Sequence, residues 1–194
     1  MSHETVLAAL SKLSKIRVWH TAPKEFASHV LSESARSVII LNGSAIEHML
    51  GAQIEERVPG LNSDEKSRIF GPEGPIGTFS NKISMAKGLQ IIDRHDARRA
   101  DIVRCMRNAA AHCVSPVRFS DEAFKDAVAQ LTPSDLRPKV KALDEFGLRH
   151  FFVLTCMSLS STINGRGPTG TPEELYSQVY ELARPGALLD KPAG

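Results

Sequence analysis

The sequence has few cysteines and no long apolar run, which argues against several common protein classes. Its three cysteines, Cys105, Cys113 and Cys156, are an odd number, and no Cys-x-x-Cys or His-x-His pair accompanies them. This pattern argues against a disulfide framework and a zinc site, and it favours a reducing cytoplasm. The longest apolar segments are far shorter than a membrane span, and the N-terminus lacks the apolar core of a signal peptide. We therefore expect a cytoplasmic protein with no membrane contact, no metal and no cofactor.

A strong excess of charge of one sign is also missing. The chain has 24 Lys and Arg against 22 Asp and Glu, which gives a formal net charge of +2. No overall field would attract nucleic acid, so any contact with RNA requires a local basic surface. Runs of charge are usually solvated faces, but six arginines around one predicted helix are candidates for such a surface: Arg94, Arg98, Arg99, Arg104, Arg107 and Arg118.

Strand patterns are almost absent, and apolar residues recur instead at helical spacing. With 194 residues, of which 42% are hydrophobic, the chain is long enough for one domain with a substantial core. We predict an all-α, single-domain helical bundle with a short extra C-terminal helix. The expected helices cover about 2–16, 23–58 (one long helix or two sharing an axis), 62–70, 79–92, 97–114, 120–131, a short piece starting at Thr132, 140–163, and a terminal helix that starts at Thr171-Pro172 and runs to residue 182.

The predicted helices divide the chain into three regions. Residues 1–22 would form an N-terminal helical arm, residues 23–163 the helical domain, and residues 164–194 a linker, the terminal helix and a frayed tail. The apolar stripe of the long helix includes Leu41, and that of the last core helix includes Phe146. Both side chains are therefore expected in the core.

The glycine-rich segment 71–79 fits either a phosphate-binding loop or an ordered turn. The Lys-Ser/Thr pair that follows the last glycine of a Walker A motif is absent, and no strand precedes the segment. We favour an ordered loop that turns the chain, with Thr78 or Ser80 capping the next helix. Lys82, in the first turn of that helix, is then expected to face a central cleft.

Polar side chains are concentrated in the helical segment 104–113. At 100° per residue, Arg104, Asn108 and His112 follow one another at one-turn spacing on a common face. Arg107 lies about 140° around the helix from His112. The alanines at 109–111 would allow another helix to approach closely.

Arg107, Asn108 and His112 are the candidate catalytic residues. An arginine guanidinium is a permanently charged fork suited to phosphate, and histidine exchanges protons near neutral pH. Together they could cleave RNA without a metal, with Asn108 orienting the imidazole or donating to a phosphate oxygen. The alternative is structural: arginine and asparagine can bind loop carbonyls, and a histidine at a helix C-terminus can cap the last carbonyls.

Four further residues are candidates for substrate binding: Arg104, Lys82, Arg36 and Glu47. Arg36 and Glu47 lie within the apolar stripe of the long helix, and either one could point into the cleft beside Arg107 and His112. Arg36 could instead pair with Glu33 on the surface, three residues away. Carboxylates on helices are usually solvated, which favours a Glu47 side chain in solvent over one that points into the cleft.

The segment from Arg107 to His112 is similar to the Arg-x4–6-His motif of the HEPN superfamily. That resemblance implies a small all-helical domain, of a kind often found as metal-independent ribonucleases that dimerise to build a composite site. A longer resemblance, over roughly residues 30–160, is to the mannitol operon repressor family. It is carried by Glu33-Ser34-Ala35-Arg36, the segment 74–83, Gly88-Leu89-Gln90-Ile91-Ile92, the Arg107–His112 motif and Phe119.

These resemblances and the residues themselves leave three functions open. The first is a regulator like the mannitol repressor, acting through a protein partner or RNA. No helix-turn-helix with a basic recognition helix is present, so autonomous sequence-specific DNA binding is not expected. The second is a metal-independent endoribonuclease that uses Arg107 and His112. The third is a non-catalytic interaction module in which the alanine face forms a homodimer contact.

Overall fold

The computed structural model describes residue 5 and residues 33–183, and the described part is all-helical, as the sequence predicts. Eight helices occur there, numbered α3 to α10: Ala35–Glu56, Ser63–Phe70, Phe79–Gly88, Arg94–His112, Glu122–Gln130, Arg137–Lys141, Glu145–Ile163 and Pro172–Ala183. The predicted helix 2–16, the start of the predicted helix 23–58 and the predicted tail after Pro185 lie outside the described residues. Within those residues, no helix has the length and apolar character to cross a membrane.

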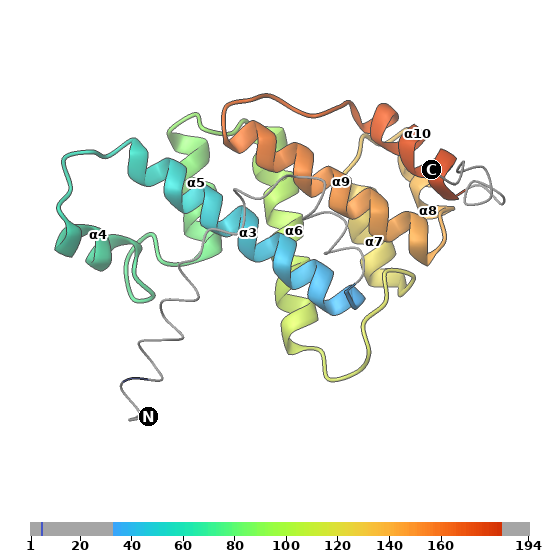
Figure 1. Ribbon diagram of the computed structural model, residues 1–194, viewed down its shortest axis with the longest axis horizontal. Helices are drawn as coiled ribbons and strands as arrows, with labels where there is room; N and C mark the ends of the chain where they lie inside the picture. The colour runs from blue at the N-terminus through green and yellow to red at the C-terminus, as the bar shows by residue number, and fades with distance from the viewer. Residues whose placement is uncertain (1–4, 6–32, 184–194) are drawn as a thin grey trace, which may run out of the picture.

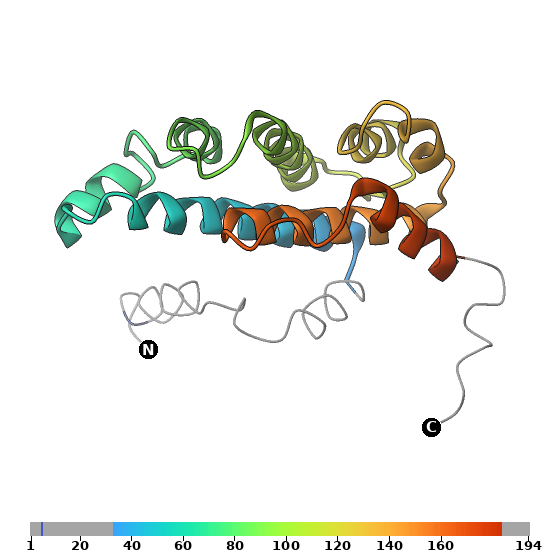
Figure 2. The same ribbon diagram turned by 90° about the horizontal axis from the view of Figure 1, so that it is seen from above.

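The helices form two layers. Helices α3 and α9 lie side by side in one layer, and α10 packs against α9 (Figure 1). Helices α5, α6 and α7 form the second layer and run across the first, as Figure 2 shows from above. Helix α3 contacts α5 and α6 of the second layer, and α9 contacts α6 and α7, so both helices of the first layer join the two layers.

The core lies between these layers and is almost entirely apolar. Helix α3 contributes Ile46 and Leu50, and α6 contributes Val103, all three without solvent exposure. Phe152 of α9 packs against Phe119 with ring centroids 5.4 Å apart. Because each fully buried side chain of this size contributes about 1.5–3 kcal/mol, this shared core holds the layers together.

Short polar side chains fix where the helices begin. Asn62 forms a capping box with Glu65 at the start of α4, and Thr78 accepts the N–H of Asn81 at the start of α5, which confirms the predicted cap. Asp93 accepts the N–H of Asp96, so residues 93–96 form the cap and first turn of α6. Helix α6 therefore starts at Arg94, and the predicted start at residue 97 was wrong.

Several predicted boundaries and core positions differ from the structure. The predicted helix 79–92 ends at Gly88, because Gln90 adopts a φ of 57° that a helix does not tolerate. The predicted helix 140–163 begins only at Glu145, after the separate short helix α8. Leu41 and Phe146 are 40% and 43% exposed, so their placement in the core was wrong. Both lie on helices whose buried stripe is wide, and periodicity alone did not locate its edge.

The loop between α4 and α5 is a compact turn whose backbone donors are used within it. The N–H of Ile76 donates to the carbonyl of Ile69 at 3.0 Å, and the N–H of Gly77 donates to that of Gly74 at 2.9 Å. A Cβ at Gly74 would collide with backbone carbonyls of α4. The glycines therefore serve close packing, in agreement with the ordered loop favoured over phosphate binding.

The carboxylate of Glu145 joins the start of α9 to the segment that follows α6. It accepts the N–H groups of Phe119 at 3.0 Å and Ser120 at 2.7 Å. Partial burial alone would raise the pKa of Glu145, but these hydrogen bonds and the nearby Arg149 outweigh burial and lower the pKa below its ordinary 4.5. The ionised carboxylate is therefore favoured in the folded chain.

We predict that Glu145→Gln lowers the free energy of unfolding at neutral pH by about 1–2 kcal/mol, because two charge-assisted hydrogen bonds lose their anionic acceptor. Since the folded-state pKa is lowered, the wild-type advantage is complete above the ordinary pKa of 4.5 and is lost as the pH falls through the folded-state pKa. Urea unfolding of both proteins over this pH range measures the difference. A difference that does not change with pH would contradict this account.

Candidate functional site

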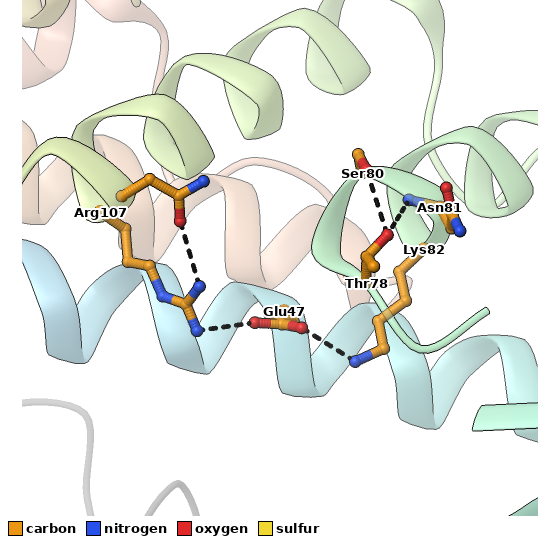
Figure 3. Close-up of polar contacts among 7 residues, drawn as sticks. Glu47, Thr78, Ser80, Asn81, Lys82 and Arg107 are labelled. Carbon is orange, nitrogen blue, oxygen red and sulfur yellow. Dashed lines mark hydrogen bonds and ion pairs between the residues drawn. The ribbon is translucent and has the colours of Figure 1, made fainter. Parts of the chain in front are cut away.

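Glu47 of α3 lies between two cationic side chains from two other helices. Its Oε1 accepts a hydrogen bond from Nζ of Lys82 on α5 at 3.0 Å, and its Oε2 accepts one from Nη2 of Arg107 on α6 at 3.2 Å. Figure 3 shows the carboxylate aligned between the two donors. The exposed fractions of the side chains are 17% for Glu47, 14% for Lys82 and 32% for Arg107. The three charges thus form a partly buried network that joins three helices.

Two glycines on α3 make room for this network. Gly43, Glu47 and Gly51 are spaced four residues apart and therefore lie along one face of the helix. A Cβ at Gly43 would come within 2.7 Å of the Cβ of Arg107, closer than packed carbons approach. At Gly51 the nearest atom would be Cε of Lys82 at 3.7 Å, an ordinary contact. Gly43 is therefore the position that allows α6 to cross α3 at Arg107.

The remaining donors of Arg107 are partly occupied as well. Its Nη1 donates to Oδ1 of Asn108 at 3.2 Å. The guanidinium is thus held by an ion pair on one side and an amide on the other, and Asn108 contacts Arg107. Glu47 or Arg36 was expected beside Arg107 and His112: Glu47 contacts Arg107 but not His112. Lys82 contacts the same carboxylate.

His112 does not join this network. It is exposed in the last turn of α6, and among the described residues it has no hydrogen bond or ion pair. The 140° separation expected from helical spacing is maintained because α6 continues to residue 112 without loosening. Neither Arg107 nor Glu47 contacts the imidazole, so the described contacts do not bring His112 together with the phosphate-binding group that the motif requires.

Arg36 has a role that sequence analysis missed. Its Nη1 donates to the carbonyl of Ala110 at 2.6 Å, and its Nη2 donates to the carbonyl of Ser115 at 2.7 Å. Arg36 therefore satisfies backbone acceptors at the C-terminus of α6, a role that the structural interpretation had given to His112. Because Arg36 and Ala110 are 74 residues apart, no local sequence signal could have found this contact.

The arginines of α6 do not form a continuous basic surface. Arg99 is buried, and its Nη1 donates to Asp96 at 3.0 Å. Arg104 is directed along its own helix, with Nε donating to Asp101 at 2.8 Å. The hydrogen bond to Asp101 is the main reason for the raised pKa of Arg104. The exposed arginines left from the predicted group are Arg94, Arg98 and Arg118.

Side chains with metal-binding chemistry lie together at the start of α6, but they are already in use. Asp93, His95 and Asp96 are close enough to share an ion. However, Asp93 caps the helix through the N–H of Asp96, and Asp96 pairs with Arg99. All three cysteines are free, and burial raises the pKa of the Cys156 thiol. We assign no metal or cofactor to these groups.

We predict that Gly43→Ala lowers the free energy of unfolding by about 1–3 kcal/mol, because the new methyl group overlaps the rigid Cβ of Arg107 and α6 must move. Gly51→Ala is the matched control on the same helix. There, the added Cβ meets only ordinary contacts, so the higher helix propensity of alanine should stabilise the fold by up to about 1 kcal/mol. Chemical denaturation of both variants measures these changes, and equal effects at the two glycines would contradict the proposed close approach.

Comparison with known proteins yields a match in structure and none in sequence. The sequence matches no family model and no curated protein. Among solved structures, the fold is similar to that of the MtlR chain in the X-ray structure of the MtlR-HPr complex from Escherichia coli. The TM-score is 0.56 at 19% sequence identity, and the match covers 72% of this chain and 98% of the other. At this identity, the comparison establishes a shared fold: the described domain has an MtlR-like, all-helical architecture.

Proposed function

We propose that this protein is a regulator that acts by binding a protein partner, in the manner of a mannitol repressor-like protein. The observation that carries the proposal is the similarity to MtlR, a chain whose structure was determined in a complex with HPr. The match extends over 98% of that chain, so it involves the whole MtlR architecture.

The candidate site also favours binding over catalysis. Glu47 neutralises part of the charge of Lys82 and Arg107, which reduces their attraction for a phosphate group. His112 has no hydrogen-bond partner among the described residues that would orient it toward Arg107. Positioned groups are the basis of general acid–base catalysis, so this arrangement gives more support to a structural role for the Arg-Asn-x-x-x-His motif.

The charge distribution favours a protein partner over DNA. With a formal net charge of +2 and two of the candidate arginines paired with aspartates on α6, the described surface lacks a row of cations matched to a duplex. Regulation through a bound protein needs no such surface. Tight sequence-specific binding of the purified protein to duplex DNA would contradict this part of the proposal.

We predict that the purified full-length chain binds HPr from its own organism with a dissociation constant in the micromolar range or tighter. Isothermal titration calorimetry gives the affinity and stoichiometry, and light scattering coupled to gel filtration shows whether one or two copies of the chain enter the complex. HPr from Escherichia coli provides a second titration. Absence of binding in both titrations would remove the partner on which the proposal rests.

An RNA cleavage assay separates this proposal from the ribonuclease alternative. We expect no cleavage of mixed single-stranded RNA in EDTA, because Arg107 contacts Glu47 and Asn108, and none of its described contacts is with the imidazole of His112. The wild-type protein is compared with Arg107→Ala and His112→Ala, after each variant is shown to be folded by thermal melting. Cleavage that is lost in both folded variants would establish the ribonuclease and contradict the regulatory proposal.

A further inference from the structure

A cavity of about 240 Å³ lies beside the Glu47 network, between α3, the end of α4 and the start of α5. Its lining includes Glu47, Ala52 and Glu55 of α3, Phe70 of α4 and Lys82 of α5. Pockets for drug-sized ligands have about 300–1,000 Å³, so this space fits a ligand of roughly side-chain size and not a nucleotide. It is formed entirely by described residues.

The charges around the cavity are not evenly paired. Lys82 is neutralised by Glu47 at 3.0 Å, and Arg107 lies against the other oxygen of the same carboxylate. Glu55 is partly buried, and its carboxylate has no hydrogen bond or ion pair among the described residues. His48 also lines the cavity and is exposed, so Glu55 is the carboxylate of the lining that has no ion pair among the described residues.

The other walls of the cavity are apolar. Phe70 is partly buried and packs against the core, so its ring is held in place by neighbouring side chains. Ala52 and Gly51 form a thin surface on α3 that leaves space next to the ring. A fixed aromatic ring near a free carboxylate is an arrangement that suits a planar or compact cation with an alkyl stem.

We propose that this cavity binds the alkyl guanidinium or alkyl ammonium group of an arginine, a lysine or a free amine. The cation pairs with Glu55, and its stem lies against Phe70 and Ala52. A guanidinium fits better than an ammonium, because it can donate two hydrogen bonds to one carboxylate while stacking on the ring. This inference concerns a ligand site and stands whether or not the chain binds HPr.

The first experiment compares a charged ligand with its neutral isostere. Nα-acetyl-argininamide is titrated into the full-length, isotopically labelled protein, beside Nα-acetyl-citrullinamide and inorganic phosphate, at constant ionic strength. We expect shifts of the Gly51 and Ala52 amide resonances with the arginine compound and much smaller ones with the other two. Equal binding of the citrulline compound, or preferential binding of phosphate, would overturn the proposal.

Two variants then test whether the carboxylate of Glu55 provides the charge that binds the ligand. Glu55→Gln should weaken binding of the arginine compound by about tenfold, because the charge-assisted pair is lost. Glu56→Gln is the matched control: it removes the same charge from the adjacent residue, whose carboxylate accepts from Gln53 and does not line the cavity. Equal loss in the two variants would show a general charge effect and overturn the assignment to Glu55.

Lys82→Met should strengthen binding if the ligand is a cation and weaken binding if the ligand is an anion. It retains an apolar stem over Gly51, removes the competing cation and leaves Glu47 more available, so binding of the arginine compound should strengthen. Lys87→Met is the control, because Lys87 is exposed on the same helix and has no ion pair among the described residues. Weaker binding in a folded Lys82→Met protein would mean that the ammonium holds an anion and would overturn the proposal.

Two further ligands distinguish a free small molecule from a protein side chain as the natural occupant of the cavity. Agmatine carries the guanidinium as a free small molecule, whereas a blocked Gly-Arg-Gly peptide carries it within a chain. Binding of both supports the proposal, with a protein side chain as the natural occupant. Binding of agmatine alone supports the proposal with a small metabolite as the occupant, and binding of neither overturns it.

Discussion

The carboxylate of Glu47 and the glycine one turn before it are the features on which the arrangement of α3, α5 and α6 depends. A partly buried carboxylate is costly unless charges of opposite sign are held close to it. Lys82 and Arg107 reach Glu47 from two different helices, at 3.0 and 3.2 Å. Arg107 can do so only because Gly43 lets its backbone pass close to α3. The polar network and the close helix crossing therefore require each other.

This dependence changes how the polar segment of α6 is interpreted. In the sequence, the segment from Arg107 to His112 resembles the motif of a metal-independent nuclease. In the structure, the guanidinium contacts Glu47 and Asn108, while His112 lies in solvent at the helix end. Arg36 further fixes that end by binding carbonyls of Ala110 and Ser115. Arg107 therefore contributes to the packing of α6 against α3, and the described contacts do not involve His112 in it.

The amount that could be predicted from the sequence depended on how local each interaction is. Helical periodicity gave the all-α class, and a short polar residue before an apolar helix gave the cap at Thr78. The link between Arg36 and Ala110, and the fit of Gly43 against Arg107, join segments more than 60 residues apart. Such contacts depend on the crossing of the helices, which no local pattern encodes.

The burial of individual side chains could also be predicted from the sequence only in part. Arg99 was assigned to a basic surface because arginine is usually solvated, but pairing with Asp96 allows it to be buried. Glu47 was similarly expected in solvent unless it served the cleft. For both residues, an oppositely charged partner accompanies the burial of the side chain. The partner of Arg99 lies three residues away on the same helix, whereas the partners of Glu47 come from two other helices and depend on how these pack.

A double-mutant cycle between Glu47 and Arg107 tests the central claim most directly. The free energies of unfolding of Glu47→Gln, Arg107→Met and the double variant give the coupling between the two side chains. We expect a coupling on the order of 1 kcal/mol or more, since the ion pair is partly buried and lies at a helix crossing. The cycle of Glu47→Gln with His112→Ala should be additive, because those side chains have no contact. Additivity within about 0.3–0.5 kcal/mol in the Arg107 cycle would show that the network does not join the helices.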